Sequence, residues 1–248
     1  MNRLGRWTAP LLGVATFFGL WELLLVALNV KPFVLPRPSH TIAAISHDLS
    51  FFAKEAAITG SEALAGLLIA LVVALALAVP MARWRAVERA VQPVATLIQV
   101  VPIVCFAPAF VIWMSPGTLP IVAVAALISL VPLLFTLVLG LKSADPAVIE
   151  LMRSVGASRW EILRSVEGPG ALRSVLAGSR IAVGLALVGA VLGEPFALRS
   201  HGLGVQIYKG LNGGATLIWS CAFVLGLMGG LAMLALAGLE RLLPGRQR

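Results

Sequence analysis

The stretch KSADPAVIELMRSVGASRWEILRSVEGPGALR, residues 142–173, decides the fold because it is the longest run of this chain that cannot sit in a lipid bilayer. It holds nine of the thirty Asp, Glu, Lys and Arg residues in thirty-two of the 248 positions. Long apolar runs lie directly before and after it. We therefore predict a water-facing segment between two membrane spans, and we call it the charged segment.

Two short helices around a turn are predicted within the charged segment. Asp145 followed by Pro146 is a helix start with proline at the first helical position, and Gly156 interrupts the helical run. We expect the Gly-Pro-Gly run at 168–170 to end the second helix. Trp160 is expected to contact a partner or to pack the two short helices together, and packing is favoured. A solvated loop that only links two spans is the alternative.

The composition is that of a membrane protein. Hydrophobic residues make up 59% of the chain, charged residues 12%, and the mean hydropathy is +0.97. We predict an all-α integral membrane protein with one domain over residues 1–248. About twenty apolar residues are needed to cross a bilayer. The runs that meet this length are 8–30, 58–81, 91–114, 119–141, 175–194 and 215–239.

Positive charges predict the orientation. Six spans put both termini on one side, and that side then holds fourteen of the 19 Lys and Arg residues, Arg3, Arg246 and Arg248 among them. Positive residues concentrate on the cytoplasmic side of membrane proteins, so we predict cytoplasmic termini and a cytoplasmic charged segment. The net charge of +8 reports this orientation and does not require a nucleic-acid partner.

The third predicted span is irregular. It contains Pro93, Pro102 and Pro108 together with Gln99. Internal prolines free backbone carbonyls, which need protein or a water-lined path around them. Two interpretations are open: a kinked helix beside a translocation path, or an ordinary kink buried in the bundle.

The remaining polar residues of the spans give weaker indications. Glu22 lies in the first span and Glu62 in the second; snorkelling or a helix-to-helix hydrogen bond is favoured over a functional site for both. Cys105 and Cys221 both fall in apolar runs. They indicate neither a disulfide framework nor a metal site.

Several motifs are absent from the sequence. It has no G-x-x-x-x-G-K-[ST] run to hold ATP phosphates, no H-E-x-x-H and no G-x-S-x-G. We therefore expect no enzyme activity on this chain, and any ATP that drives it must bind another polypeptide. A stand-alone ion-coupled secondary transporter is the alternative, although the chain shows one broken-helix candidate and no internal repeat.

The charged segment resembles the EAA loop of ABC importer permeases, whose pattern is E-A-A, three residues, G, nine residues, I-x-L-P. The residues in register with it are Glu150, Gly156, Val166, Gly168 and Pro169. Leu151 and Met152 replace the two alanines, Val166 replaces isoleucine and Gly168 replaces leucine. In that family the loop forms a coupling helix that docks into a separate ATPase subunit.

Other stretches resemble permeases of the nitrate, sulfonate and taurine importer class. They are Pro102, Ala107-Pro108 and the turn at 115–117, then Gly193-Glu194-Pro195 and the His201-Gly202-Leu203-Gly204 turn, and the resemblance covers residues 36–204. Glu194 is expected to meet a binding protein, to help close an outer gate, or only to cap the span at the interface. A structural role is favoured for His201.

The resemblance implies a permease subunit in a bacterial inner membrane, for a sulfonate-, nitrate- or taurine-like or related small solute. The implied partners are a cytoplasmic ABC ATPase, a second copy of this chain and an extracytoplasmic binding protein; the chain itself needs no cofactor or metal. ATPase coupling is assigned to Glu150, Gly156, Ala157, Ser158, Trp160 and Pro169. The pathway or outer gate is assigned to Gln99, Pro102, Pro108 and Glu194.

Overall fold

The computed structural model describes residues 5–242 and contains no β-strand within them. The elements are α1 (Gly5–Ala27), α2 (Pro38–His47), α3 (Leu49–Arg83), α4 (Arg85–Val100), η1 (Ile103–Cys105), α5 (Phe106–Met114), α6 (Thr118–Lys142), α7 (Pro146–Ser154), α8 (Arg159–Ile162), η2 (Leu163–Glu167), α9 (Gly168–Gly193), η3 (Glu194–Ala197), α10 (Leu203–Gly213) and α11 (Ala215–Leu242). The predicted all-α fold class is confirmed.

Membrane-crossing helices account for most of the chain. Within the described residues, the helices that are long and apolar enough are Leu49–Arg83, Thr118–Lys142, Arg159–Ala197 and Ala215–Glu240. The helices α4 and α5 qualify only as a pair, with a bend of 91° between them. The described apolar part of α1, Leu12–Ala27, is shorter. A multi-pass helical protein is thus confirmed, while the number of six spans stays a prediction.

The helices α3, α6 and α9 form the core of the bundle. They approach closely because small residues face one another. A Cβ atom added to Gly66 of α3 would lie 2.6 Å from Cβ of Ala125 on α6, and one added to Gly189 of α9 would lie 2.7 Å from Cα of the same alanine. Gly178 similarly faces Thr136. Gly178 and Gly189 therefore let α9 approach α6 closely.

Two predicted boundaries are wrong. The second span was expected to begin at residue 58, but α3 begins at Leu49, where Asp48 accepts a hydrogen bond from the N–H of Phe51 at 3.2 Å. The fifth span was expected over 175–194, but it continues without a sharp break from α8 to η3 as one 39-residue run. Both helices extend past the hydrocarbon core because caps, and not apolar composition, set where they begin.

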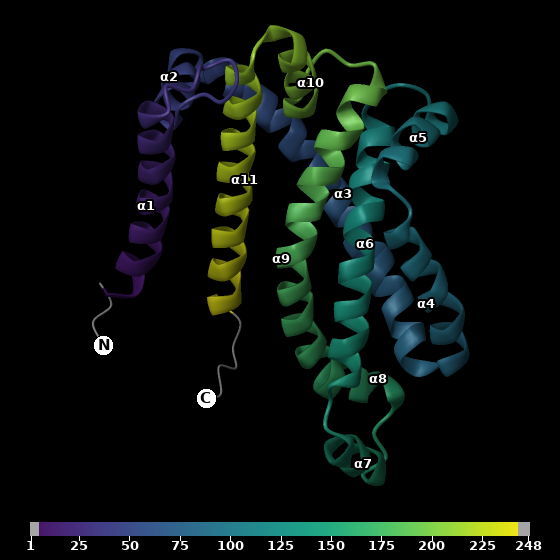
Figure 1. Ribbon diagram of the computed structural model, residues 1–248. Coiled ribbons are helices and arrows are strands. Elements are labelled where there is room, and N and C mark those ends of the chain that lie inside the picture. Colours follow the sequence, from purple (N-terminus) through teal and green to yellow (C-terminus); the bar gives the residue numbers. More distant parts are fainter. Residues whose placement is uncertain (1–4, 243–248) are drawn as a thin grey trace.

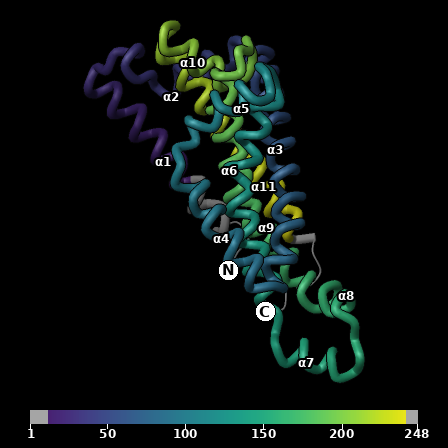
Figure 2. The backbone as a smooth tube through the Cα atoms, turned by 90° about the vertical axis from the view of Figure 1, so that its right-hand side faces the viewer, coloured from purple at the N-terminus to yellow at the C-terminus, as the bar shows by residue number. Residues whose placement is uncertain are grey.

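The bundle has two distinct ends. Figures 1 and 2 show α7 and α8 projecting beyond one end, which we call the loop end, and α10 lying at the other, which we call the α10 end. In Figure 1, α1 begins and α11 ends toward the loop end. Arg3, Arg246 and Arg248 lie outside the described residues, so the predicted cytoplasmic position of this end remains a prediction.

Contacts at the α10 end hold the first helices to the bundle. Phe18 and Trp21 of α1 meet Phe223 and Trp219 of α11, with ring centroids 5.3 and 5.2 Å apart. Glu22 accepts hydrogen bonds from the N–H and hydroxyl of Ser39 on α2, at 3.0 and 2.7 Å. The hydrogen-bond interpretation of Glu22 is therefore confirmed.

Candidate functional site

The charged segment caps its own helices. Asp145 accepts a hydrogen bond from the N–H of Ala147 at 2.8 Å, which begins α7. Ser158 and Glu161 form a capping box that begins α8: Ser158 Oγ accepts from the N–H of Glu161 at 3.2 Å, and the N–H of Ser158 donates to Glu161 Oε2 at 2.6 Å. Each cap lies within three residues of its partner, so the segment's shape is set locally.

Gly156 makes the turn between the two helices. Its φ is +82°, in the left-handed region that glycine enters without steric cost. The N–H groups of Gly156 and Ala157 donate to the carbonyls of Arg153 and Met152, both at 3.0 Å, and so close the end of α7. No heavy atom lies within 4 Å of a Cβ built on Gly156. The requirement for glycine is therefore conformational and not a matter of space.

An apolar face of α7 is uncovered. Val148, Leu151 and Val155 share one side of the helix, and Leu151 and Val155 are 64% and 73% exposed. Trp160 on α8 is 69% exposed. The expectation that Trp160 packs the two short helices together is therefore wrong, because the N-terminal cap places it on the first turn of α8 with its ring in the open.

The other residues assigned to ATPase coupling lie beside this face. Glu150 is exposed, and within the part of the chain that the structure describes it makes no ion pair or hydrogen bond. Ser158 is exposed while serving as a cap, and Ala157 is half-buried in the turn. The structure thus brings five of the six assigned residues, Glu150 to Trp160, into one projecting unit.

Pro169, the sixth, lies at the root of that unit. The Gly-Pro-Gly run does not end the helix as predicted: a π-helical turn, Leu163–Glu167, runs directly into α9, and the N–H of Gly168 donates to the carbonyl of Leu163. A regular α-helix would drive the Pro169 ring into the carbonyl of Ser165, and the wider turn relieves that clash. The proline therefore reshapes the helix without stopping it.

Two ion pairs tie the roots of the charged segment to the connection between α3 and α4. Arg83 Nη2 lies 2.7 Å from Glu167 Oε2, and Lys142 Nζ lies 2.6 Å from Glu88 Oε1. Both arise from distant parts of the chain, and neither was predicted. Charge signs alone did not indicate which of the many basic residues would pair with these acids.

The third predicted span is broken at one proline. The backbone is extended at Val101 and Pro102, between α4 and η1, and this gives the 91° bend. Pro93 and Pro108 lie inside α4 and in the first turn of α5 and break neither helix. Gln99 is exposed just before the break, and Pro108 is half-buried beyond it. The kink is confirmed, and its place beside a pathway stays a prediction.

Glu194 lies at the opposite end, fully buried. Its Oε2 accepts hydrogen bonds from the N–H groups of Gly204 and Val205, at 2.6 and 3.3 Å, and its Oε1 accepts from the Thr59 hydroxyl at 2.6 Å. It therefore caps α10 from a distance. With no exposed surface, its carboxylate cannot meet a binding protein directly in this conformation; a role in an outer gate is still a prediction.

Two residues of α3 complete this cap. Glu55 accepts from the N–H of Gly202, and Thr59 Oγ1 accepts from the N–H of Leu203 at 2.8 Å. His201 Nδ1 lies 2.9 Å from Glu55 Oε1, so His201 takes the structural role favoured for it. Together Glu55, Thr59 and Glu194 satisfy all four N–H groups from Gly202 to Val205. We call these three residues the distant cap.

The spacing of polar residues in the sequence indicates the α3 part of the distant cap. Glu55, Thr59 and Glu62 follow one another at i, i+4 and i+7, the spacing of a single helix face. Because the predicted span began at residue 58, Glu55 was left outside it. The predicted boundary therefore placed Glu55 in a loop and Thr59 and Glu62 in a span, although all three lie on one face of α3.

Glu62 is nearly fully buried and paired. Arg199 donates from Nη1 to the Glu62 carboxylate and to Thr118 Oγ1, the latter at 2.9 Å. The second carboxylate oxygen of Glu62 has no partner within the described residues. Glu62 thus pairs with the turn before α10 and does not snorkel to the surface.

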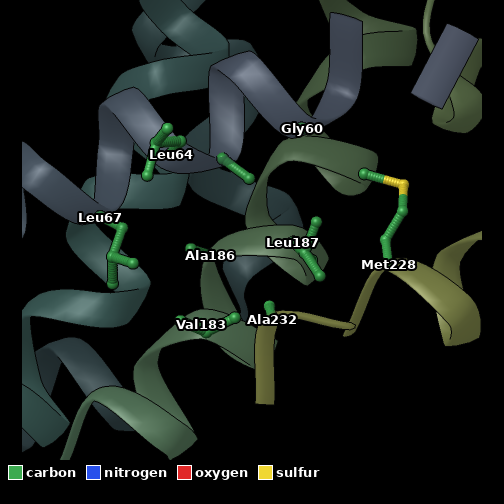
Figure 3. Close-up of a pocket in the computed structure, with 9 residues that line it drawn as sticks. Gly60, Leu64, Leu67, Val183, Ala186, Leu187, Met228 and Ala232 are labelled. Atoms are coloured by element: carbon green, nitrogen blue, oxygen red, sulfur yellow. The ribbon is translucent and has the colours of Figure 1, made fainter. Parts of the chain in front are cut away.

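A cavity of about 170 Å³ lies between α3, α9 and α11. Figure 3 shows its lining, which includes Gly60, Leu67, Leu187 and Met228. All nine lining residues are apolar or glycine, so the cavity offers no group to orient a polar solute. No group of three or more metal-ligating residues occurs in the described part of the chain either.

The sequence matches a family model described as "Binding-protein-dependent transport system inner membrane component" over residues 66–248. It is 36% identical over 252 residues to a riboflavin transport system permease protein of Chloroflexus aurantiacus, a match that covers 98% of this chain and 93% of that one. It is 30% identical over 253 residues to a formylaminopyrimidine transport permease protein of Halalkalibacterium halodurans, and that match covers both chains fully.

The fold is similar to that of a solved transporter. A chain from inward-facing conformations of the MetNI methionine ABC transporter superposes with a TM-score of 0.70 and 16% sequence identity. The superposition covers 78% of this chain and 96% of that chain. At this identity the likeness concerns the fold alone.

Proposed function

Because this chain belongs to the family of binding-protein-dependent transport system inner membrane components, we propose that its charged segment docks on a separate ATPase subunit and that its bundle lines the solute pathway. The chain is a multi-pass inner-membrane permease subunit of an ABC importer. The ion-coupled transporter considered from the sequence is not adopted, because the relatives are named as permeases of transport systems.

The uncovered apolar face of α7 is the observation that carries this proposal. Helix α7 projects beyond the other helices at the loop end (Figure 1), and its residues Val148, Leu151 and the adjoining Val155 are exposed. A soluble-phase helix that exposes such a face is a typical docking element for a groove on another protein. Glu150 lies beside this apolar face and has no partner among the described residues. It can therefore form an ionic contact at the edge of the docking surface.

The mechanism follows from where ATP must bind. This chain has no phosphate-binding loop, so a partner hydrolyses the ATP. When that partner closes on ATP, the docked segment moves as a rigid body, because its helices are capped locally. The movement passes into α6 and α9, and the pathway switches between inward- and outward-facing states.

The break at Pro102 supports a pathway beside α4 and α5. Val101 and Pro102 are extended and exposed in this single chain. Extended backbone at membrane depth is tolerated where protein or a water-filled cavity covers it, not where lipid does. A second copy of the chain facing this bend would enclose the pathway, with Gln99 and Pro102 along it. A binding protein would deliver the solute at the α10 end.

We infer a neutral, planar nitrogen heterocycle as the substrate, in place of the nitrate or sulfonate expected from the sequence. The two relatives matched over nearly the whole chain are named for riboflavin and formylaminopyrimidine. The polar side chains on the bent pair near the break, Gln92, Thr96 and Gln99, are uncharged. An anion would be better matched by a cationic lining.

Purification of the tagged chain from its native membranes tests this proposal. We expect a P-loop ATPase in stoichiometric amount with the wild type and with Leu151→Met, but not with Leu151→Asp, which places a charge at the centre of the apolar face. A copurifying binding protein should be stabilised against heat by riboflavin or a formylaminopyrimidine and not by nitrate or taurine. Wild-type chain that purifies alone and still transports would contradict the docking proposal.

A further inference from the structure

The two ion pairs at the loop end connect both roots of the charged segment to one short stretch of chain. Lys142 is the last residue of α6, where the segment begins, and Glu167 is the last residue of η2, where the projecting part of the segment ends and α9 begins. Their partners, Glu88 and Arg83, lie in the first turn of α4 and at the end of α3. The charged segment is therefore bridged at entry and exit to residues 83–88.

The pair between Arg83 and Glu167 is the more shielded. Its side chains are 22% and 12% exposed, whereas those of Lys142 and Glu88 are 38% and 27% exposed. Partly buried pairs are screened less by salt and hold their geometry better than exposed ones. Arg83 to Glu167 is therefore the principal connection, and Lys142 to Glu88 supports it.

Packing of α4 against the bundle is limited, with Val87, Val91 and Ile98 half-buried against the core. Ala95 is its one buried residue within the described structure, whereas α6 buries thirteen. A single residue, Trp84, separates α4 from α3, so the start of α4 cannot move independently of Arg83. At its other end α4 leads directly into the bend at Pro102. A displacement at residues 83–88 would thus tilt α4 and change the bend.

We propose that the Arg83–Glu167 ion pair, supported by Lys142–Glu88, transmits movement of the charged segment to α4 and to the bend at Pro102. Arg83 and Glu167 are positioning residues: they contact neither solute nor ATP. This inference rests on the proposed function, in which an ATPase moves the charged segment. It adds the route by which that movement reaches the pathway.

Cys105 offers a reporter at the bend. It is exposed in η1, three residues after Pro102, whereas Cys221 is buried. A thiol-reactive nitroxide attached in detergent therefore labels the bend. Its electron paramagnetic resonance spectrum is recorded in the copurified complex under two conditions: without nucleotide, and with ATP and orthovanadate. The readout is the ratio of the mobile to the immobile component of this spectrum. A variant that is only less stable would not make this ratio depend on nucleotide.

The test compares charge reversals. In the wild type the ratio should shift with ATP and orthovanadate. In Arg83→Glu the nucleotide-dependent shift should fall about tenfold, the size of a typical coupling between sites. The double exchange Arg83→Glu with Glu167→Arg should restore it. Arg85→Glu is the matched control, since Arg85 is exposed and makes no ion pair within the described residues.

Three results would overturn the inference: an Arg83→Glu response equal to that of Arg85→Glu, a double exchange no better than the single reversal, or a wild-type complex that hydrolyses ATP with no change at Cys105. If Arg83→Glu does not assemble with the ATPase, Arg83→Gln removes the pair without repulsion and must show the same loss. Absence of any ATPase from the wild-type complex would instead contradict the proposed function.

Discussion

The two ends of this bundle meet the same requirement in opposite ways. A helix begins with N–H groups that need acceptors. At the loop end, α7 and α8 receive them from Asp145 and Ser158, which adjoin the helices they cap. At the α10 end, α10 receives them from the distant cap: Glu55 and Thr59 lie on α3, and Glu194 lies in η3, ten residues before Gly204.

This difference separates a part that can move from a part that cannot. A locally capped segment keeps its shape whatever its neighbours do, so it can be displaced as a unit. A helix capped from α3 and from η3, which directly continues α9, is fixed to both, and any change at one of them must break buried hydrogen bonds. The loop end is therefore suited to receive force, and the α10 end is suited to hold α3 and α9 together where they meet α10.

The largest effect is expected from Glu194→Ala. This substitution leaves the N–H groups of Gly204 and Val205 without an acceptor in a buried site, at a cost of about 3 kcal/mol or more in folding free energy. Thermal unfolding in detergent measures it. Glu194→Gln, which keeps an acceptor oxygen, should lose less. Equal unfolding temperatures of Glu194→Ala and the wild type would contradict the claim that Glu194 stabilises the start of α10.

A smaller and strictly local effect is expected from Gly156→Val. A β-branched residue at φ +82° costs about 2 kcal/mol in the turn. Because a Cβ there touches nothing, the unfolding temperature of the bundle should stay near wild type while ATPase copurification falls. Gly156→Asn, which tolerates positive φ, is the control and should retain the ATPase. If the Gly156→Val and Gly156→Asn variants retained the same amount of ATPase, the turn geometry would not be needed for docking.

The smallest effect is expected from Ser158→Ala. Loss of this cap should cost about 1 kcal/mol and appear only as faster amide exchange over residues 158–162. Ser154→Ala, whose hydroxyl bonds a carbonyl of α7 and caps no N–H, is the matched control. Faster exchange at α10 as well would mean that the two ends are not independent.

Local patterns predicted the loop end well. Asp145-Pro146 indicated where α7 begins, and Gly156 indicated the turn that its φ of +82° confirms. Both depend on interactions within a few residues, which a sequence displays directly. The Gly-Pro-Gly run misled because a π-helical turn before it accommodates the Pro169 ring, so the helix continues through the proline into α9.

Long-range contacts were not predictable in the same way. The sequence indicated that Glu194 and Glu62 were unusual, but not that Glu194 would cap α10 or that Arg199 would reach Glu62. The contacts made by residues of α3 at this end join positions more than a hundred residues apart. Charge and hydropathy do not specify which of such distant groups meet. The ion pairs of Arg83 and Lys142 escaped prediction for the same reason.

The most direct test of the central claim is photo-crosslinking in native membranes from a single exposed cysteine carrying benzophenone, since the remaining Cys221 is buried. In a Cys105→Ser background, Val155→Cys on the apolar face of α7 should yield a product containing this chain and a P-loop ATPase. Tyr208→Cys, similarly exposed on α10, should yield none with the ATPase. An ATPase product from Tyr208→Cys, or none from Val155→Cys, would contradict the account.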